Sequence, residues 1–323
     1  MFWLFKAARR LRELGILGMN RRNAAFILDH NPRSRFPIVD DKLRMARLCQ
    51  RIGVPTPQLY LELSSYSMLR HLPRLLGERS DFVVKPNRGS AGRGVLVIIG
   101  RDGKDYLRHN GAKVPPDALR QHFSDILSGM YSLGGQPDTV IVQQRIRLHP
   151  AFESITYKGI PDVRVILYRN EPAMAMLRLP TKASNGRANL HQGGIGTGID
   201  LDSGITHHAV QRNRFVERHP DTGRPVVGMN VPFWGEVLDM SRNVARAVGL
   251  GYLGVDIVVD QDAGPMLLEA NARPGLAIQI ANGQGLLPRL QAIDTLLDQP
   301  ARMPSLERLR KVPRVQEPQR KSA

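Results

Sequence analysis

Residues 254–276 constrain the fold more than any other stretch of this 323-residue chain, because they contain the pattern of a complete β-hairpin. Along 255–260, apolar residues alternate with a set that includes two aspartates, which predicts a strand with two different faces. The polar and glycine residues at 261–264 are typical of a turn, and 265–271 predicts the returning strand. The stretch therefore predicts two antiparallel strands joined by a four-residue turn.

Three oxygen-bearing side chains fall on one face of this predicted hairpin. With a four-residue turn, Asp256 faces Glu269, and Asn271 shares the face of Glu269 because it lies two residues further on. Two carboxylates that face each other repel. A hard cation removes that cost, and Mg²⁺ binds a few carboxylates together with substrate phosphates. A solvated acidic hairpin without metal is the interpretation that these three residues alone leave open.

The motif D-x(12)-E-A-N-x-x-P-G in this stretch resembles the metal-binding end of ATP-grasp carboxylate–amine ligases, and most closely the RimK-type α-L-glutamate ligase group. The resemblance implies an α+β, ATP-grasp fold, in which two α+β subdomains clasp ATP. It also implies that Asp256, Glu269 and Asn271 hold Mg²⁺, or Mn²⁺ in its place, between the ATP phosphates.

The composition is that of a globular protein, with 42% hydrophobic residues. The single cysteine, Cys49, allows no internal disulfide and favours a reducing compartment. No apolar run reaches the length of a membrane span. At the start of the chain the apolar residues precede the basic ones, which is the reverse of a signal peptide. We therefore expect a cytoplasmic protein without a transmembrane segment.

The formal net charge of +17 is concentrated at the two ends of the chain. Residues 1–36 carry eight Lys/Arg against two Asp/Glu, and residues 301–323 carry seven against two. The body between them is only mildly basic, which argues against a nucleic-acid-binding groove through a folded domain. The basic ends could contact an anionic partner such as RNA, lipid or an acidic polymer.

We expect three parts: a basic helical N-terminal extension (1–36), an ATP-grasp domain (37–300) and a disordered basic tail (301–323). The ATP-grasp domain is expected to divide into 37–142, which contains the glycine-rich loop, and 143–300, which contains the metal site. The resemblance implies that the domain preceding the ATP-grasp core is reduced. Within the extension, 3–17 predicts a helix with an apolar stripe and a basic face. We favour packing of this stripe on the body over binding to a membrane surface.

Residues 40–53 predict a helix that Asp40 or Asp41 caps and that Gly53 ends. The D-K pair at its start resembles the opening of an ATP-grasp domain. The resemblance makes Lys42 a candidate ATP contact, although a lysine in a first helical turn is ordinarily only solvated.

Residues 81–99 predict a strand, a glycine-rich loop and a second strand. The first strand ends at Lys85, whose charge could meet a phosphate. Glycines in such a loop let backbone N–H groups approach phosphate oxygens; the candidate loop residues are Gly89, Ser90, Gly92 and Gly94. Val95-Leu96 stand where a P-loop has Lys-Ser/Thr, and no helix follows, so a P-loop is excluded. The segment resembles the phosphate-covering loop of ATP-grasp enzymes, with an ordinary glycine hairpin as the alternative.

Residues 140–146 read VIVQQRI and predict a buried strand. The resemblance implies that this strand continues into the hinge that holds adenine, with Gln143, Gln144 and Ile146 as nucleotide contacts. The family often has a carboxylate where Gln144 stands. A glutamine can accept hydrogen bonds from ribose hydroxyls but carries no charge.

Asp162 and Arg164 share one face of a predicted strand, and Arg178 lies on the next strand, 173–179. The resemblance implies that Asp162 lies by the nucleotide and Arg164 by the reacting carboxyl, with Arg178 at a position where RimK-type ligases also have arginine. A surface salt bridge between Asp162 and Arg164 is the alternative.

The segment GRANLHQGG at 186–194 closely resembles the R-x-N-L-H-x-G-G motif of the RimK group. The resemblance implies that Arg187 and Asn189 face the ATP phosphates. His191 is either a substrate contact or a structural histidine. Residues 205–232 predict irregular structure, and helices are expected at 234–248 and 288–298.

The resemblance implies an ATP- and Mg²⁺-dependent ligase that forms an amide through an acyl-phosphate. Its partners would be ATP, a carboxylate on a small molecule, peptide or protein C-terminus, and an amine such as glutamate. Arg164 and Arg178 would stabilise charge on the reacting groups. Three alternatives stay open: a kinase-like phosphotransferase, a non-catalytic ATP-binding module, and an adaptor that binds an anionic partner through the charged ends.

Overall fold

The computed structural model describes residues 2–89 and 92–298, and contacts within the chain divide them into two compact units. Among the described residues, unit 1 takes in 2–35, 154–256 and 271–298, and unit 2 takes in 36–153 and 257–270. The division of the ATP-grasp domain at residue 142 stays a prediction. Ser90 and the predicted disordered tail lie outside the described residues.

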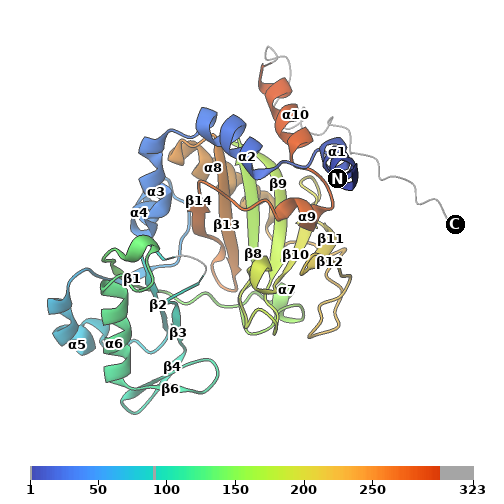
Figure 1. The fold of residues 1–323 in the computed structure, drawn as a ribbon. Helices are drawn as coiled ribbons and strands as arrows, with labels where there is room; N and C mark the ends of the chain where they lie inside the picture. The colour runs from blue at the N-terminus through green and yellow to red at the C-terminus, as the bar shows by residue number, and fades with distance from the viewer. Residues whose placement is uncertain (1, 90–91, 299–323) are drawn as a thin grey trace. The chain divides into compact units, whose positions relative to one another are not determined.

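Unit 2 is built on a four-stranded antiparallel sheet in the order β1-β7-β2-β3 (Figure 1). Its strands are β1 (Leu59–Leu63), β2 (Phe82–Pro86), β3 (Leu96–Ile98) and β7 (Val140–Gln143), and a smaller sheet contains β4 (Gly100–Asp102), β5 (Asp105–Leu107) and β6 (Lys113–Val114). Its helices are α3 (Phe36–Asp40), α4 (Lys42–Arg51), η3 (Tyr66–His71), α5 (Leu72–Leu76), α6 (Pro116–Leu127), η4 (Leu133–Gly135) and α7 (Pro150–Glu153). The strand–loop–strand predicted at 81–99 is therefore present as β2 and β3.

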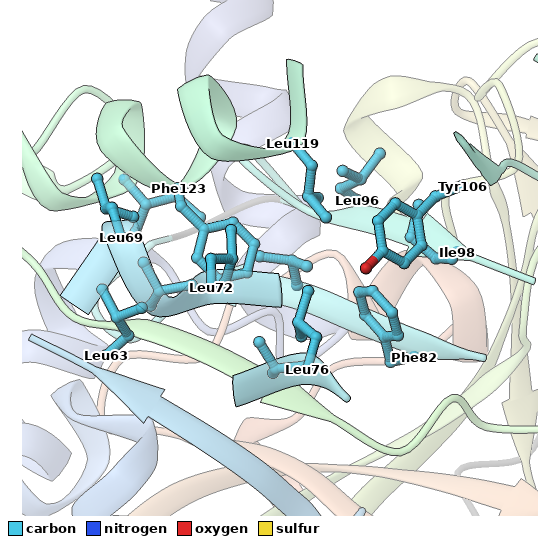
Figure 2. Packing of buried hydrophobic residues seen from close by; sticks show 14 of the residues in the cluster. Leu63, Leu69, Leu72, Leu76, Phe82, Leu96, Ile98, Tyr106, Leu119 and Phe123 are labelled. Atoms are coloured by element: carbon cyan, nitrogen blue, oxygen red, sulfur yellow. The ribbon is translucent and has the colours of Figure 1, made fainter. Parts of the chain in front are cut away.

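The core of unit 2 forms where α6 covers apolar side chains from the sheet and from η3 and α5 (Figure 2). Leu119 and Phe123 recur at helical spacing on α6 and are almost completely buried. Phe82 of β2 lies edge-to-face against Tyr106 of β5, with ring centroids 5.6 Å apart, so the core also joins the two sheets.

Helix α4 begins where the sequence predicts, and Asp41 is its cap. The Asp41 carboxylate accepts a hydrogen bond of 2.9 Å from the backbone N–H of Arg44. Met45 and Cys49 lie on the buried face of the helix. Burial raises the pKa of the Cys49 thiol to about 11.

Unit 1 contains most of the seven-stranded sheet β12-β11-β10-β9-β8-β13-β14, whose residues 257–270 at the end of β13 and in β14 are counted with unit 2 (Figure 1). The strands are β8 (Asp162–Tyr168), β9 (Glu171–Leu179), β10 (Ile195–Ile199), β11 (Thr206–Gln211), β12 (Arg214–Phe215), β13 (Tyr252–Asp260) and β14 (Gly264–Asn271). The helices are α1 (Phe2–Glu13), α2 (Met19–Arg21), η1 (Arg22–Leu28), η2 (Arg33–Arg35), η5 (Leu190–Gln192), α8 (Trp234–Val248), α9 (Ile278–Asn282) and α10 (Leu287–Asp298). The hairpin β13–β14 carries the chain from unit 1 into unit 2 and back.

Both faces of the sheet are covered at β13, because all nine residues of this strand are buried. Helix α8 packs on β8 and β9, and α9 packs on β9, β10 and β11. Helix α8 ends at Gly249, as predicted, where a left-handed φ of +70° suits a glycine. Within the described part of the chain, no helix combines the length and apolar character needed to cross a bilayer.

Three local predictions were wrong. The first helix ends at Glu13 instead of residue 17, because Gly15 turns the chain with a φ of +67°. Strand β14 begins at Gly264, so the hairpin turn has three residues instead of four. The expected pairing of Asp256 with Glu269 depended on a four-residue turn and therefore has no basis. Residues 205–232, predicted to be irregular, contain β11 and β12, since pairing of β11 with β10 and of β12 with β11 stabilises strands that the local pattern does not indicate.

Candidate active site

A pocket of unit 2 lies where α4, the sheet and the end of β14 meet. Lys42, Lys85 and Glu269 are its charged members. The rest of the lining is mostly apolar and comprises Val39, Leu43, Met45, Ala46, Thr56, Pro57, Leu59, Ile141, Gln143, Leu267, Leu268 and Ala270. An apolar pocket with a few convergent polar groups is the usual form of a small-molecule site.

Lys85 is the most perturbed basic group of this pocket. Burial, together with the nearby Lys42, lowers the pKa of Lys85 to about 7, and Glu269 opposes both effects. The charged form of the amine is therefore less favoured than in an exposed lysine. An anionic ligand in the pocket would favour its charged form, which suits Lys85 to contact a phosphate.

Lys42 holds the start of the glycine-rich loop. Its Nζ donates hydrogen bonds to the carbonyl oxygens of Gly89 (2.7 Å) and Asn87 (3.3 Å). Asn87 is in turn bonded to α4, because its Oδ1 accepts a hydrogen bond from the backbone N–H of Leu43. The predicted role of Lys42 as an ATP contact stays a prediction, while in this structure its amine organises the loop.

The far end of the loop, at Gly94, lies against α6 and the turn after it. The Nε2–H of His122 donates to the Gly94 carbonyl at 3.0 Å, since a carbonyl can only accept. A Cβ at Gly94 would lie 2.6 Å from the ring of Tyr131. Gly92 and Gly94 both have left-handed backbone, with φ of +70° and +72°. Both the left-handed φ of residue 94 and the close approach of the Tyr131 ring therefore require glycine at this position.

The structure places the three predicted adenine-side residues differently. Gln143 is buried and lines the pocket. The Oε1 of Gln144 accepts the backbone N–H of Gln58 at 3.1 Å, which ties it to the start of β1. Gln144 and Ile146 are not among the lining residues. Sequence analysis missed most of the apolar lining, because side chains such as Met45, Leu59 and Leu268 show only the ordinary pattern of a core.

Unit 1 contains a buried cluster of two arginines and two aspartates. Arg164 donates two hydrogen bonds to the Asp256 carboxylate, at 2.7 and 2.6 Å. Arg178 donates to both oxygens of Asp162 and also to Asp256, at 2.7 Å. Asp162 and Arg164 are therefore not the surface salt bridge that the sequence left open, since each pairs with a residue on another strand.

Burial affects the two carboxylates of this cluster unequally. Burial raises the pKa of Asp162, and Arg178 only partly opposes it. Burial would also raise the pKa of Asp256, but Arg164 and Arg178 together lower it below its usual range. The cluster has no net formal charge when all four groups are ionised, which lets it stay buried.

The segment between β9 and β10 contains the residues of the predicted R-x-N-L-H-x-G-G motif. Arg187 is exposed, as is His191. The Oδ1 of Asn189 accepts the backbone N–H of His191 at 3.0 Å and caps the short helix η5. The predicted contacts of Arg187 and Asn189 with ATP phosphates stay predictions.

The predicted metal ligands are divided between the units, with Asp256 and Asn271 in unit 1 and Glu269 in unit 2. Their carboxylate and amide oxygens are the donors that Mg²⁺ prefers. Both oxygens of Asp256 accept guanidinium hydrogens, and the Oδ1 of Asn271 accepts the backbone N–H of Arg273. Across residues 2–89 and 92–298, no three His, Cys, Asp or Glu side chains are grouped to hold a metal ion. The donors fit Mg²⁺ by chemistry, and the trio stays a prediction.

A family model described as "Sugar-transfer associated ATP-grasp" matches residues 21–295, which is most of the chain. The chain belongs to this ATP-grasp family. The expected α+β, ATP-grasp fold is thereby confirmed, with its strands and helices as described above.

The fold of this ATP-grasp protein is similar to several solved structures. One is the ATP-grasp ligase PsnB complexed with minimal precursor, at a TM-score of 0.44 and 17% identity over 82% of this chain. A second is D-cycloserine synthetase DcsG, at a TM-score of 0.45 and 16% identity over 83% of this chain and 73% of that one. A third is a RimK domain protein ATP-grasp from Sphaerobacter thermophilus DSM 20745, at a TM-score of 0.43 and 12% identity over 81% of this chain and 69% of that one. The match spans only 63% of the PsnB chain. No curated protein matches the sequence.

Proposed function

We propose that this protein is an ATP- and Mg²⁺-dependent carboxylate–amine ligase that forms an amide through an acyl-phosphate. The observation that carries the proposal is the pocket of unit 2, where Lys42, Lys85 and Glu269 stand at the edge of an apolar lining in a chain of the ATP-grasp family. An apolar wall suits a base, and Lys85 suits the phosphates attached to it.

In this proposal the residues of unit 2 bind the nucleotide. Gln143 and the apolar lining would hold the adenine ring. Lys85 and the backbone of the loop from Gly89 to Gly94 would hold the phosphates, while Lys42 keeps the loop in place through its two carbonyl bonds. Glu269 would face the same nucleotide with its carboxylate and hold Mg²⁺.

The residues of unit 1 would handle the reacting groups. Arg164 and Arg178 carry the positive charge that a carboxylate substrate and its phosphorylated form require. Asp256 and Asn271 would supply the remaining metal ligands. Held by these residues, Mg²⁺ would neutralise charge on the phosphates.

The reaction needs no nucleophile from the protein. A carboxylate oxygen of the substrate bonds to the γ-phosphorus as the bond to the bridging oxygen of ADP breaks. The amine nitrogen then bonds to the carbonyl carbon, inorganic phosphate leaves with the electron pair of the C–O bond, and the nitrogen loses a proton. The arrangement explains why the site offers cations and metal ligands, while Cys49, the single cysteine of the chain, is buried.

The acid and the amine are open within this proposal. Glutamate is the amine suggested by the RimK resemblance. Because the family is described as sugar-transfer associated, we would include uronic acids and amino sugars in a substrate pool beside amino acids and peptides. A kinase-like transfer to a hydroxyl and a non-catalytic ATP-binding role are the competing functions.

The test is substrate-dependent ADP release in Mg²⁺ with this pool, followed by hydroxylamine in place of the amine. A ligase yields a hydroxamate, because hydroxylamine captures the acyl-phosphate, whereas a kinase yields a stable phosphate ester. Glu269→Ala should abolish turnover, and Glu78→Ala, an exposed glutamate of the same unit, should leave it unchanged. ADP release without any hydroxamate would contradict the ligase assignment.

A further inference from the structure

Arg22 is a buried charged residue of unit 1 that the proposed function does not use. It begins helix η1 and is only 7% exposed. Its Nη1 donates a hydrogen bond to the Pro274 carbonyl oxygen at 2.8 Å, and its Nε and Nη2 donate to the Oδ1 of Asn23 at 3.1 and 2.8 Å. In the described part of the chain, no carboxylate forms an ion pair with it. The charge of Arg22 is therefore hydrogen-bonded to neutral groups and has no counter-ion among the described residues.

Tyr252, at the start of β13, contributes a buried hydroxyl that lacks a partner. The tyrosine is completely buried, and its hydroxyl makes no hydrogen bond to any described residue. Its backbone is fixed, because Asn31 accepts its N–H at 2.8 Å and donates to its carbonyl oxygen at 2.7 Å. The ring lies beside Phe26 of η1, with centroids 6.3 Å apart. Since buried hydroxyls are almost always hydrogen-bonded, the exception at Tyr252 requires an explanation.

The two groups lie close enough to affect each other. Burial raises the pKa of Tyr252, and the positive charge of Arg22 opposes this. Burial, together with the exposed Arg273, lowers the pKa of Arg22, and Tyr252 opposes the shift. The hydroxyl could accept a guanidinium N–H directly, but no hydrogen bond joins the two side chains. Both groups therefore have hydrogens available for a third species that accepts from each of them.

The guanidinium retains donors for such a species. An arginine side chain has five N–H groups, and the bonds to Asn23 and Pro274 use one each on Nε, Nη1 and Nη2. One N–H on Nη1 and one on Nη2 are left without an acceptor among the described residues. A water molecule would satisfy the Tyr252 hydroxyl but would leave the buried charge uncompensated, whereas an anion does both.

We propose that the guanidinium of Arg22 and the hydroxyl of Tyr252 bind a chloride ion inside unit 1. The ion is small because Tyr252 has no exposed surface and Arg22 has very little, so a larger oxyanion or a substrate carboxylate has no open path to the site. The bound ion would hold η1 against β13 and stabilise the folded unit. The site lies within one unit and is independent of the nucleotide pocket and of the proposed function.

The test is thermal unfolding of the full-length protein as chloride replaces gluconate at constant total salt. An ion that binds only the folded state raises the midpoint in a saturable way. Tyr252→Phe removes only the hydroxyl and should weaken chloride binding about 10- to 100-fold, the effect of losing one hydrogen bond to a charged group. In gluconate alone this variant should be at least as stable as the wild type, because it removes an unpaired buried hydroxyl. In saturating chloride it should be the less stable of the two.

Two further variants are needed for the interpretation. Tyr168→Phe alters another completely buried tyrosine of unit 1, whose hydroxyl lies 2.9 Å from the Nε2 of His30. It should differ from the wild type by the same amount in both salts. Arg22→Met removes the charge and should abolish the saturable response to chloride. If Arg22→Met does not fold, the reversed order of Tyr252→Phe and the wild type in the two salts still decides the matter.

A crystal grown in bromide provides a direct measurement, because bromide replaces chloride and scatters anomalously. The expected result is an anomalous peak within hydrogen-bonding distance of both Arg22 and Tyr252. A wild-type crystal without that peak would overturn the inference. So would a difference between Tyr252→Phe and the wild type that is the same in both salts, since the hydroxyl would then contact only water or nothing. None of these measurements involves nucleotide, so their failure leaves the ligase proposal untouched.

Discussion

Lys85 combines an amine of lowered pKa with a position in the wall of an apolar pocket. Lys85→Met keeps the aliphatic part and removes the amine. We expect ATP to bind about 10- to 100-fold more weakly, since a hydrogen bond to a charged group contributes about 1.5–3 kcal/mol. AMP binding should change much less if the amine meets the outer phosphates. Calorimetric titration of both nucleotides is the measurement.

The matched control for this prediction is Lys104→Met, an exposed lysine in the turn between β4 and β5 of the same unit. It should bind both nucleotides as the wild type does. An equal loss of AMP and ATP affinity in Lys85→Met would mean that Lys85 shapes the pocket as a whole and does not select for the phosphates.

Arg178 is the member of the buried cluster that joins both aspartates. Arg178→Met leaves Asp162 and Asp256 with a single arginine between them. Because breaking a buried ion pair leaves an uncompensated charge, we expect the free energy of unfolding to fall by about 3–5 kcal/mol. Urea denaturation measures it. Arg246→Met, at an exposed site on α8, should change it by no more than about 0.5 kcal/mol.

At the scale of elements, the glycine-rich loop depends on what α6 and its following turn place beside Gly94. Gly94→Ala introduces a Cβ into the Tyr131 ring, whereas Gly103→Ala places one in open space at a similar φ of +60°. Both variants incur the cost of left-handed backbone, about 1–2 kcal/mol. Gly94→Ala should lose a further 1–3 kcal/mol or so from overpacking, measured by urea denaturation.

The double variant Gly94→Ala/Tyr131→Ala tests the cause of that extra loss. Removing the ring should recover most of the difference between Gly94→Ala and Gly103→Ala. If the double variant is as unstable as the sum of the two single changes, the ring is not what makes glycine necessary at this position.

His122 makes the anchoring of the loop sensitive to pH. Burial lowers the pKa of His122 below that of an exposed histidine, although its bond to Gly94 opposes the shift. Below about pH 6.5 the unfolded chain therefore binds a proton that the folded protein does not. We expect the free energy of unfolding to decrease as pH falls from 6.5 toward the folded pKa. His122→Gln, which keeps a donor, should show a shallower decrease, and parallel profiles would contradict the prediction.

The elements that could be predicted from sequence are those whose signals are local. The cap of α4 at Asp41, the end of α8 at Gly249 and the strand–loop–strand at 81–99 each depend on a few neighbouring residues. Strand β11 could not be predicted, because its stability comes from β10 and from no alternation of its own. In the candidate site, too, features with local signals could be predicted, whereas those that depend on distant parts of the chain could not.

Within the site, the sequence identified the individual charged residues but not their partners. Arg164 and Asp256 are 92 positions apart, and only the order of β8 and β13 in the sheet makes them neighbours. The apolar lining of the nucleotide pocket was missed for a related reason. Its members are not distinguishable in sequence from core residues, and only the folded arrangement leaves them beside a cavity.

For the whole molecule, the important feature is that unit 2 interrupts unit 1 twice in the sequence. Residues 257–270, which belong to unit 2, comprise the end of β13, the turn and β14 up to Ala270, and the chain returns to unit 1 at Asn271. A strand pair that serves both units should couple their unfolding. We therefore expect one cooperative transition for the chain.

A ligand of unit 2 can test this coupling with a reporter in unit 1. The variant Trp3→Phe leaves Trp234, which is buried in unit 1, as the sole tryptophan. AMP at 100 times its Kd should stabilise a coupled molecule by about 2.7 kcal/mol and raise the unfolding midpoint reported by Trp234. Ribose 5-phosphate serves as the control. A midpoint that AMP does not move, in a protein shown to bind it, would mean that the units unfold separately.

The burial of Cys49 makes this protein suitable for spectroscopic distance measurements. It is the only cysteine of the chain, it is inaccessible, and its raised pKa leaves almost no reactive thiolate at neutral pH. Two cysteines introduced at exposed positions, for example Lys104 in unit 2 and Arg246 in unit 1, could be labelled selectively without replacing Cys49. Spin or fluorescent labels at those positions would then report the separation of the two units in solution, with and without nucleotide.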